Sequence, residues 1–198
     1  MILLEGFTKY FHKGSINEVS ALKNIHLKIE QGDFITVIGS NGAGKSTLLN
    51  GLAGCFLPDT GGMFLDDADI TGWPEYRRAE FIGRVFQDPL LGTCATLSIQ
   101  QNMALAHKRG HRRSLRIGVR YAQRTRFREA LQKIGLGLED RLGDRVGLLS
   151  GGQRQALTML MATMVRPRLL LLDEHTAALD PKTAQEILNL TRRIVEER

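Results

Sequence analysis

The segment GSNGAGKST, from Gly39 to Thr47, places three glycines directly before a lysine and two hydroxyl side chains. Glycine lets the backbone adopt left-handed conformations and approach a ligand closely, so that successive N–H groups are able to point at one anion. The helix expected from Lys45 onward adds the positive end of its dipole at the same place. This spacing, G-x-x-x-x-G-K-S after the apolar run FITVI, predicts a phosphate-binding loop between a strand and a helix.

The loop predicts a binding site for a nucleoside triphosphate with Mg²⁺, and each of its residues is a candidate contact. The candidates are Gly39, Ser40, Asn41, Gly42, Ala43, Gly44, Lys45, Ser46 and Thr47. We expect Lys45 to reach the β- and γ-phosphates, Ser46 to offer its hydroxyl to Mg²⁺, and Thr47 to hydrogen-bond the α-phosphate. The alternative is a glycine-rich turn with a lysine by chance, and the order of strand, loop and helix argues against it.

A second stretch, RLLLLDE from Arg168 to Glu174, has the composition of a buried parallel strand that ends in two acids. Ligands of α/β sheets collect at the carboxyl ends of the strands. We therefore expect Asp173 to hold Mg²⁺ and Glu174 to act as the catalytic base that polarises the attacking water. Acids that merely cap the end of a strand are the alternative. The phosphate loop about 130 residues earlier favours the catalytic interpretation.

The pentapeptide LSGGQ precedes a segment with apolar residues at helical spacing, so it should open a helix. Its candidate nucleotide contacts are Ser150, Gly151, Gly152 and Gln153. Exposed N–H groups and a hydroxyl at a helix start make a second anion site. One chain does not need two such sites for one triphosphate, so we expect a head-to-tail dimer in which this helix start faces the γ-phosphate held by the partner. A helix that merely begins with Ser-Gly-Gly leaves the second site unexplained.

Five motifs occur in one order: the phosphate loop GSNGAGKST, Gln87 in VFQDP, LSGGQRQ, LLLLDE and AALDP. In these motifs the chain resembles the ATP-binding cassette (ABC) ATPases, the nucleotide-binding subunits of ABC transporters, over its whole length. The resemblance implies an α/β fold: a P-loop NTPase core with a mainly parallel sheet, an N-terminal antiparallel β subdomain and an inserted helical subdomain. It divides the chain into a core at 1–87, a helical subdomain at 88–165 that ends in the LSGGQ helix, and the second part of the core at 166–198.

The resemblance also assigns three further site residues. Gln87 matches the glutamine that senses Mg²⁺ and the attacking water, which makes it a metal and a catalytic candidate. Asp180 in AALDP matches the loop that crosses the dimer interface near the partner's active site. Tyr10 stands where the family places an aromatic ring that stacks on adenine, and the adjacent Phe11 would serve as well. Both rings are also compatible with packing at a strand edge.

By resemblance the chain is the ATP-binding and ATP-hydrolysing subunit that powers an ABC transporter through ATP-driven head-to-tail dimerisation. Its implied cofactors are ATP and Mg²⁺, and its implied partners are a second copy, an integral membrane permease and a substrate-binding protein. The implied location is cytoplasmic, peripheral on the inner face of the membrane, since no apolar run approaches the roughly 18 to 20 residues that span a bilayer. The transported substrate is not encoded in these motifs, and a separate ATPase chain mildly favours import.

The alternative class is an ABC-type ATPase that acts on DNA or the ribosome. Proteins of that kind carry long coiled-coil arms or two cassettes in one chain, whereas the insert here is about sixty residues without a heptad run. Nucleic acid is therefore not an expected partner. The basic run from His107 to Arg128 has nine Lys or Arg and no acid, in a chain of net charge +6. Four interpretations of the run itself stay open: a solvated face, contact with nucleic acid, contact with anionic lipid headgroups, or contact with an acidic loop of the permease.

Three departures from the family pattern carry expectations of their own. His175 takes the place of the usual proline after Glu174, and its register argues against a catalytic histidine. Asp67 stands where the family has glycine at a tight turn, which predicts a wider or distorted turn. The chain ends at Arg198, before the family's final strands and switch histidine, so we expect a truncated cassette that binds ATP better than it hydrolyses it.

Overall fold

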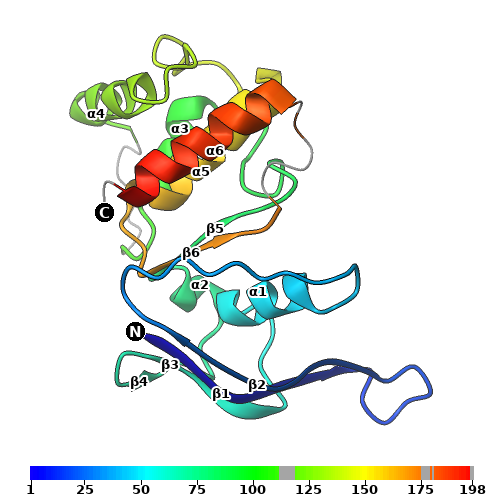
Figure 1. Cartoon of the computed structure of the whole chain (residues 1–198). Coiled ribbons are helices and arrows are strands. Elements are labelled where there is room, and N and C mark those ends of the chain that lie inside the picture. Colours follow the sequence, from blue (N-terminus) through cyan, green and yellow to red (C-terminus); the bar gives the residue numbers. More distant parts are fainter. Residues whose placement is uncertain (112–118, 175–178, 180, 197–198) are drawn as a thin grey trace. The chain divides into compact units, whose positions relative to one another are not determined.

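The computed structural model describes residues 1–111, 119–174, 179 and 181–196 of the 198-residue chain. The chain separates into two compact units, Met1–Ala79 and Glu80–Arg198 (Figure 1). Each unit has a sheet and buried apolar side chains of its own. The domain limits predicted at residues 87 and 165 follow the order of the motifs rather than packing, and they stay a prediction.

The first unit is built on a four-stranded antiparallel sheet in the order β2-β1-β3-β4. Its strands are β1 (Ile2–Phe11), β2 (Val19–Ile29), β3 (Thr60–Leu65) and β4 (Ala68–Asp69). At the start of β1 the burial alternates, because Ile2 and Leu4 are buried while Leu3 is only half-buried. The N-terminal antiparallel β subdomain that the family resemblance implied is confirmed.

β3 and β4 are joined by a two-residue turn, because Leu65 pairs with Ala68 in the ladder. Asp66 adopts a φ of 51°, a left-handed conformation that aspartate tolerates better than most residues. The carboxylate of Asp66 also accepts a hydrogen bond of 2.6 Å from the amino group of Met1. Of the two alternatives predicted from Asp67, a wider or a distorted turn, the wider turn is therefore wrong. The left-handed position falls one residue earlier, on Asp66.

The strand predicted directly before the phosphate loop is not a strand in the structure. Residues 33–40 form no ladder with the described parts of the chain. The apolar side chains in this segment are exposed: Phe34, Ile35, Val37 and Ile38. A segment counts as a β-strand only when its backbone is hydrogen-bonded to a neighbouring strand. The sheet of the first unit consists of β1–β4 and does not include FITVI. Apolar composition alone does not supply that neighbour.

The helices of this unit are α1 (Lys45–Ala53) and the short α2 (Glu75–Arg78). Arg78 is fully buried, and its guanidinium donates to the carbonyl oxygens of Gly51 and Leu52 in the last turn of α1, at 2.8 and 3.2 Å. It also donates to the carbonyl oxygens of Thr71 and Trp73, at 2.8 and 3.0 Å. Burial lowers the pKa of Arg78 below its ordinary value. The cation satisfies carbonyls at a helix end where the dipole favours positive charge.

Arg78→Met is expected to lower the free energy of unfolding by about 3 kcal/mol or more, because several buried carbonyl oxygens lose their donor. The matched control is Arg77→Met. Arg77 is exposed, with its guanidinium carbon 3.7 Å from the centre of the Trp73 ring, and its loss should cost less than about 1 kcal/mol. Urea unfolding followed by circular dichroism measures both variants, and equal stabilities would refute the anchoring role of Arg78.

The second unit contains a parallel pair of strands packed against helices. β5 (Ile82–Val85) pairs with β6 (Leu169–Leu172) residue for residue. The helices are α3 (Ile99–His107), α4 (Tyr121–Gln132), α5 (Gly151–Met164) and α6 (Pro181–Glu196), with a 3₁₀ turn at Val146–Leu148. A Cβ atom on Gly83 of β5 would lie 2.7 Å from the carbonyl oxygen of Ala162, so α5 packs closely on the strand. The parallel strand predicted from RLLLLDE is confirmed.

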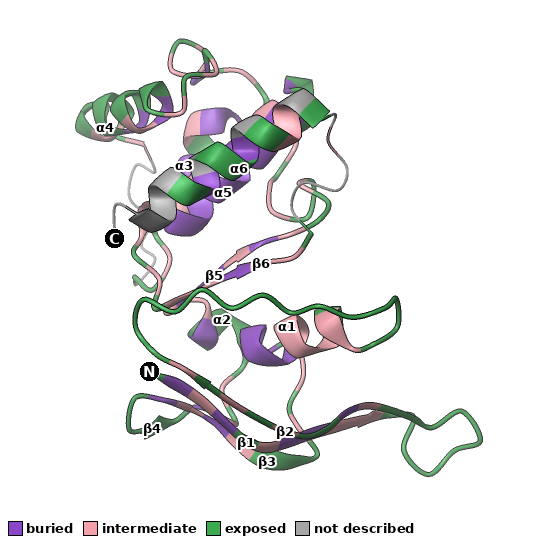
Figure 2. Cartoon of the chain, viewed as in Figure 1, coloured by how far each residue is buried: buried purple, intermediate pink, exposed green. Residues whose placement is uncertain are grey.

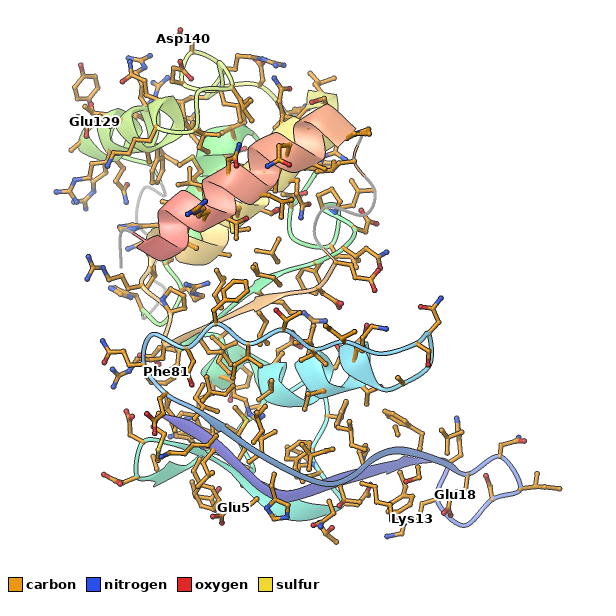
Figure 3. The ribbon with its side chains drawn as sticks, in the orientation of Figure 1. Glu5, Lys13, Glu18, Phe81, Glu129 and Asp140 are labelled. Carbon is orange, nitrogen blue, oxygen red and sulfur yellow. The ribbon has the colours of Figure 1, made fainter. Side chains whose placement is uncertain are left out.

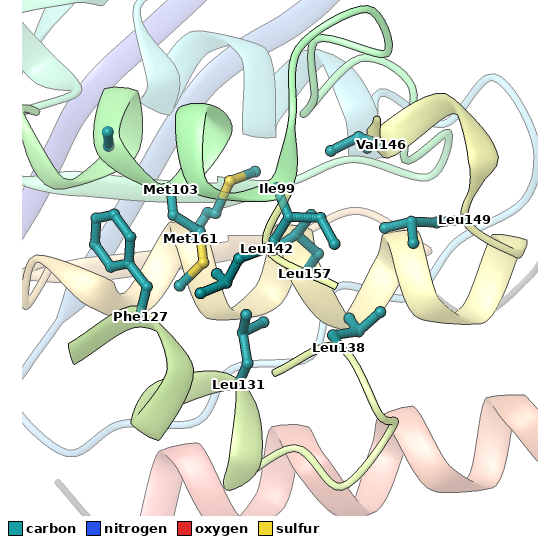
Figure 4. Packing of buried hydrophobic residues seen from close by; sticks show 11 residues of the cluster. Ile99, Met103, Phe127, Leu131, Leu138, Leu142, Val146, Leu149, Leu157 and Met161 are labelled. Carbon is teal, nitrogen blue, oxygen red and sulfur yellow. The ribbon is translucent and has the colours of Figure 1, made fainter. Parts of the chain in front are cut away.

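Two clusters of buried side chains stabilise the second unit. The first joins α3, α4 and α5 (Figure 4) and contains Ile99, Met103, Ala104, Phe127, Leu131, Leu138, Leu142, Val146, Leu149, Leu157 and Met161. The second joins β5, α5 and α6 through Val85, Ala156, Met159, Ala162 and Ile187. Most of α5 is buried, whereas α4 buries only Phe127 and Leu131 (Figure 2). α5 is therefore the central helix, and packing holds its first turn in place.

Candidate active site

The phosphate loop lies in the first unit and leads directly into α1. Gly42 and Gly44 have φ values of 82° and 89°, which glycine adopts without strain. The Ala43 N–H donates to the carbonyl oxygen of Ser40 at 3.2 Å, which closes a turn. The helix predicted from Lys45 is present, and Ser46 and Thr47 lie in its first turn.

The Lys45 ammonium is bound to the loop itself. Its Nζ donates to the carbonyl oxygens of Gly39 and Ser40, at 2.9 and 3.0 Å. A cation held there, together with the N–H groups at the start of a nine-residue helix, fits the chemistry of a polyphosphate. The hydroxyl of Ser46 is an oxygen donor of the kind that Mg²⁺ accepts.

A methyl group at Gly44 is expected to damage this loop more than a methyl group at Gly42. Both positions are left-handed, so alanine costs about 1–2 kcal/mol at either. At Gly44 the added Cβ would also lie 2.8 Å from the carbonyl oxygen of Ala21 in β2, whereas at Gly42 it would meet nothing within 4 Å. Gly44→Ala should weaken binding of a fluorescent ATP analogue about tenfold more than Gly42→Ala does. Equal losses would show that the contact with β2 does not hold the loop in place.

In the second unit, the carboxyl ends of β5 and β6 meet at one edge of the parallel pair. Gln87 follows β5 by two residues, while Asp173 and Glu174 follow β6 directly. The Asp173 N–H donates to the carbonyl oxygen of Val85 at 3.1 Å, which extends the pairing one step past the strands. Gln87 and Glu174 are exposed, and Asp173 is half-buried. The structure thus brings together the residues predicted for metal binding and catalysis that this unit contains.

Arg84 is a neighbour of Asp173 that sequence reasoning missed. Its Nη2 lies 3.6 Å from Oδ2 of Asp173, and the two side chains are only 13% and 17% exposed. Its guanidinium carbon lies 4.5 Å from the centre of the Phe86 ring. A signal was present in the sequence, because an arginine within the apolar strand IGRV requires a counter-charge or another polar partner. Nothing in the sequence identified Asp173 as that partner.

The LSGGQ segment opens a helix as predicted, because α5 begins at Gly151 with Ser150 as its N-cap. We call α5 the signature helix and residues 150–153 the signature residues. Oγ of Ser150 accepts a hydrogen bond from the Gln153 N–H at 3.2 Å, and Oε1 of Gln153 accepts one from the Ser150 N–H at 3.3 Å. Gly151 is exposed. Gly152 is buried against α6, where a Cβ atom would overlap the methyl group of Thr183. The nucleotide contacts of this helix start stay a prediction.

The two aromatic candidates at the end of β1 have different surroundings. Phe11 packs edge-on against Phe56, with 5.6 Å between the ring centroids. Tyr10 has the Lys13 ammonium 5.6 Å from its ring centre, and its backbone N–H donates to Oδ2 of Asp59 at 2.7 Å. Each ring thus has a partner within its own unit, and the assignment of adenine stacking to Tyr10 stays a prediction.

The predicted site residues are divided between the two units. The first holds Tyr10 and the loop 39–47, and the second holds Gln87, the pair Asp173 and Glu174, and the signature residues 150–153. Two sequence predictions lie outside the described residues, namely those for Asp180 and His175. The same holds for residues 112–118 of the basic run.

Comparison with known proteins defines the class of protein. A family profile described as ABC transporter matches residues 22–177. The chain belongs to the ABC transporter family, as an ATP-binding cassette with ATPase function. It is 41% identical, over all of its 198 residues, to the tyrosine transport ATP-binding protein of Clostridioides difficile, of which it covers 78%. It is 38% identical, over 99% of its length, to the methionine import ATP-binding protein MetN of Corynebacterium diphtheriae and spans 55% of that relative.

Solved structures agree with this assignment. The dimeric cassette MJ0796, in a post-hydrolysis state bound to ADP and Pi, matches with a TM-score of 0.82 and 30% identity, covering 100% of this chain and 84% of that one. The expected P-loop NTPase fold and ABC ATP-binding function are confirmed, while the alternative of a DNA- or ribosome-directed ATPase finds no support among these relatives. In the part of the chain that the structure describes, no helix combines the length and apolar character needed to cross a membrane.

Proposed function

We propose that this cassette powers an importer by closing with a second copy, head to tail, around two molecules of Mg-ATP. The observation that carries the proposal is the presence of two helix starts suited to anions in one chain, α1 after Gly44 and α5 after Ser150. A two-fold axis lets the first helix start of each copy share a triphosphate with the second helix start of the other. The dimer of MJ0796 bound to ADP and Pi supports this arrangement.

Nucleotide binding is assigned to the phosphate loop, with adenine stacked on Tyr10. Lys45 would leave the carbonyl oxygens of Gly39 and Ser40 and donate to the β- and γ-phosphates. Hydrogen bonds from an ammonium to charged phosphate oxygens are stronger than those to neutral carbonyl oxygens. The signature residues 150–153 of the second copy would close the site over the γ-phosphate. Asp180 would complete the contact between the copies.

Hydrolysis is assigned to the edge formed by β5 and β6. The Mg²⁺ ligands we propose are Gln87 and Asp173 at this edge and the Ser46 hydroxyl of the first unit, and the metal would supply charge stabilisation for phosphoryl transfer. Glu174 would accept a proton from the attacking water. Since phosphoryl transfer needs little covalent chemistry from the protein, these side chains act mainly by positioning and by stabilising charge.

The partners we propose are an integral membrane permease and a substrate-binding protein, on the inner face of the membrane, with an amino acid as cargo. Two relatives support this class of cargo, since one is a tyrosine transport protein and the other a methionine import protein. The surface of α4 supports a position close to the membrane. Its exposed arginines are Arg124, Arg126 and Arg128, with the exposed Arg120 at the N-cap. The one acid of the helix is Glu129 (Figure 3). Arginines in this setting favour anionic headgroups or an acidic loop of the permease.

Affinity purification from detergent-solubilised membranes, with and without nuclease, tests the proposal. We expect one integral membrane protein to be recovered in both samples, and its transport activity then tests the amino-acid class. Recovery of ribosomes or nucleic acid without a membrane protein would overturn the permease partnership. Arg124→Glu with Arg128→Glu should weaken recovery of the integral membrane protein, and unchanged recovery would count against a role for α4.

A further inference from the structure

The pair of Arg84 and Asp173 brings two opposite charges together in a largely buried place of the second unit. Arg84 is the third residue of β5, and its side chain is only 13% exposed to solvent. Burying a guanidinium costs free energy unless an opposite charge or hydrogen bonds offset the lost hydration. The Asp173 carboxylate, 3.6 Å away, supplies the opposite charge, and the Phe86 ring covers the guanidinium carbon at 4.5 Å.

The backbone fixes this pair in place. Arg84 stands opposite Leu171 in the parallel register, and the next rung joins Val85 to Leu172. The Asp173 N–H continues the ladder with its hydrogen bond to the carbonyl oxygen of Val85. The strand register therefore places the Asp173 carboxylate beside the Arg84 guanidinium. The contact is set by the paired backbone and does not depend on the conformation of a surface loop.

We propose that Arg84 is a positioning residue that makes Mg²⁺ binding at Asp173 depend on ATP. This inference rests on the proposed role of Asp173 in Mg²⁺ binding. The guanidinium holds the carboxylate at the edge of the sheet, and its charge offsets the charge of the carboxylate. A divalent cation alone then meets a nearly neutral pair and binds weakly. When the triphosphate is present, its several negative charges restore the attraction, so that the metal is accepted only as the nucleotide complex.

A purely structural role predicts something different. If Arg84 only filled space in β5, methionine of similar length would replace it with no change in metal binding. Arg84→Met removes the charge and keeps an unbranched apolar stem, while Arg84→Lys keeps the charge and loses the planar fork. The two variants therefore separate charge from packing.

The test uses Mn²⁺ as the probe, with electron paramagnetic resonance of the intact protein in the absence of nucleotide. We expect Arg84→Met to bind Mn²⁺ about tenfold or more tightly than the unaltered chain, because the repelling charge is gone. Arg84→Lys should stay close to the unaltered chain. The double variant Arg84→Met with Asp173→Asn should lose the gain, which places the effect at this carboxylate. Thermal unfolding of each variant reports its fold, and Arg84→Gln replaces the methionine variant if that one does not fold.

Equal Mn²⁺ affinity in the unaltered chain and in the folded uncharged variant would overturn the inference. A gain that survives in the double variant would also overturn it, because the added affinity would lie elsewhere. The proposed metal role of Asp173 has its own readout, the Mn²⁺ affinity in the presence of ATP for Asp173→Asn alone. If that affinity is unchanged, the proposed metal site itself fails, whereas a loss there combined with no effect of Arg84→Met rejects only the role of Arg84.

Discussion

Glu174→Gln is expected to preserve ATP binding and to slow hydrolysis by about 10²- to 10⁴-fold, so that the ATP-bound dimer accumulates. Glu174 lies exposed just past β6, beside the edge where Gln87 follows β5. Glutamine keeps the length and shape of the side chain but cannot accept a proton from water. Light scattering after size-exclusion chromatography in ATP measures the dimer, and phosphate release measures the rate.

The backbone at this position strengthens the expectation. Glu174 has a φ of 39°, in the left-handed region that residues other than glycine seldom adopt. Strain of this kind concentrates at functional sites. The control is Glu129→Gln, an exposed carboxylate on α4, which should hydrolyse ATP at the unaltered rate. Rapid hydrolysis by Glu174→Gln without a stable dimer would show that another residue is the base.

Lys45→Met is expected to lower the affinity for ATP about 100-fold or more. Hydrogen bonds to charged groups contribute about 1.5–3 kcal/mol each, and this ammonium is assigned to two phosphates. Isothermal titration calorimetry measures the affinity. Lys23→Met, an exposed lysine in β2, is the control and should leave the affinity unaltered.

The Lys45 result depends on the loop keeping its fold. Without nucleotide, the ammonium donates to the carbonyl oxygens of Gly39 and Ser40, so its removal also alters the resting loop. Thermal unfolding without nucleotide separates this effect from the loss of phosphate contacts. An affinity within about threefold of the unaltered value would refute the assignment of Lys45 to the phosphates.

Local patterns predicted the elements whose signals lie in neighbouring residues. The apolar run RLLLLDE predicted the parallel strand β6 correctly, although only Leu171 of the strand's four residues is buried. Ser150 followed three residues later by Gln153 is the spacing of a capping box, and α5 starts there. Helix starts and strand periodicity are set within a few residues, so one sequence suffices for them.

Features that depend on distant partners were missed. The run FITVI has the composition of a buried strand, but the described parts of the chain give it no ladder. The contact of Arg84 with Asp173 depends on the register of β5 with β6, which composition does not reveal. At the β3–β4 turn, Asp66 rather than Asp67 took the left-handed position, because strand pairing decides which residue stands at the corner.

The anchoring of α1 by Arg78 gives the two ends of that helix different local stabilities. The carbonyl oxygens of Gly51 and Leu52 are held by a buried cation, while most of the loop before Lys45 is exposed. Amide hydrogen exchange should therefore be slowest near the end of α1 and become faster toward Gly39. The C-terminal end of α1 is then a rigid anchor, whereas the loop before Lys45 is the flexible part. Nucleotide binding should therefore order the loop and leave the position of the helix end unchanged.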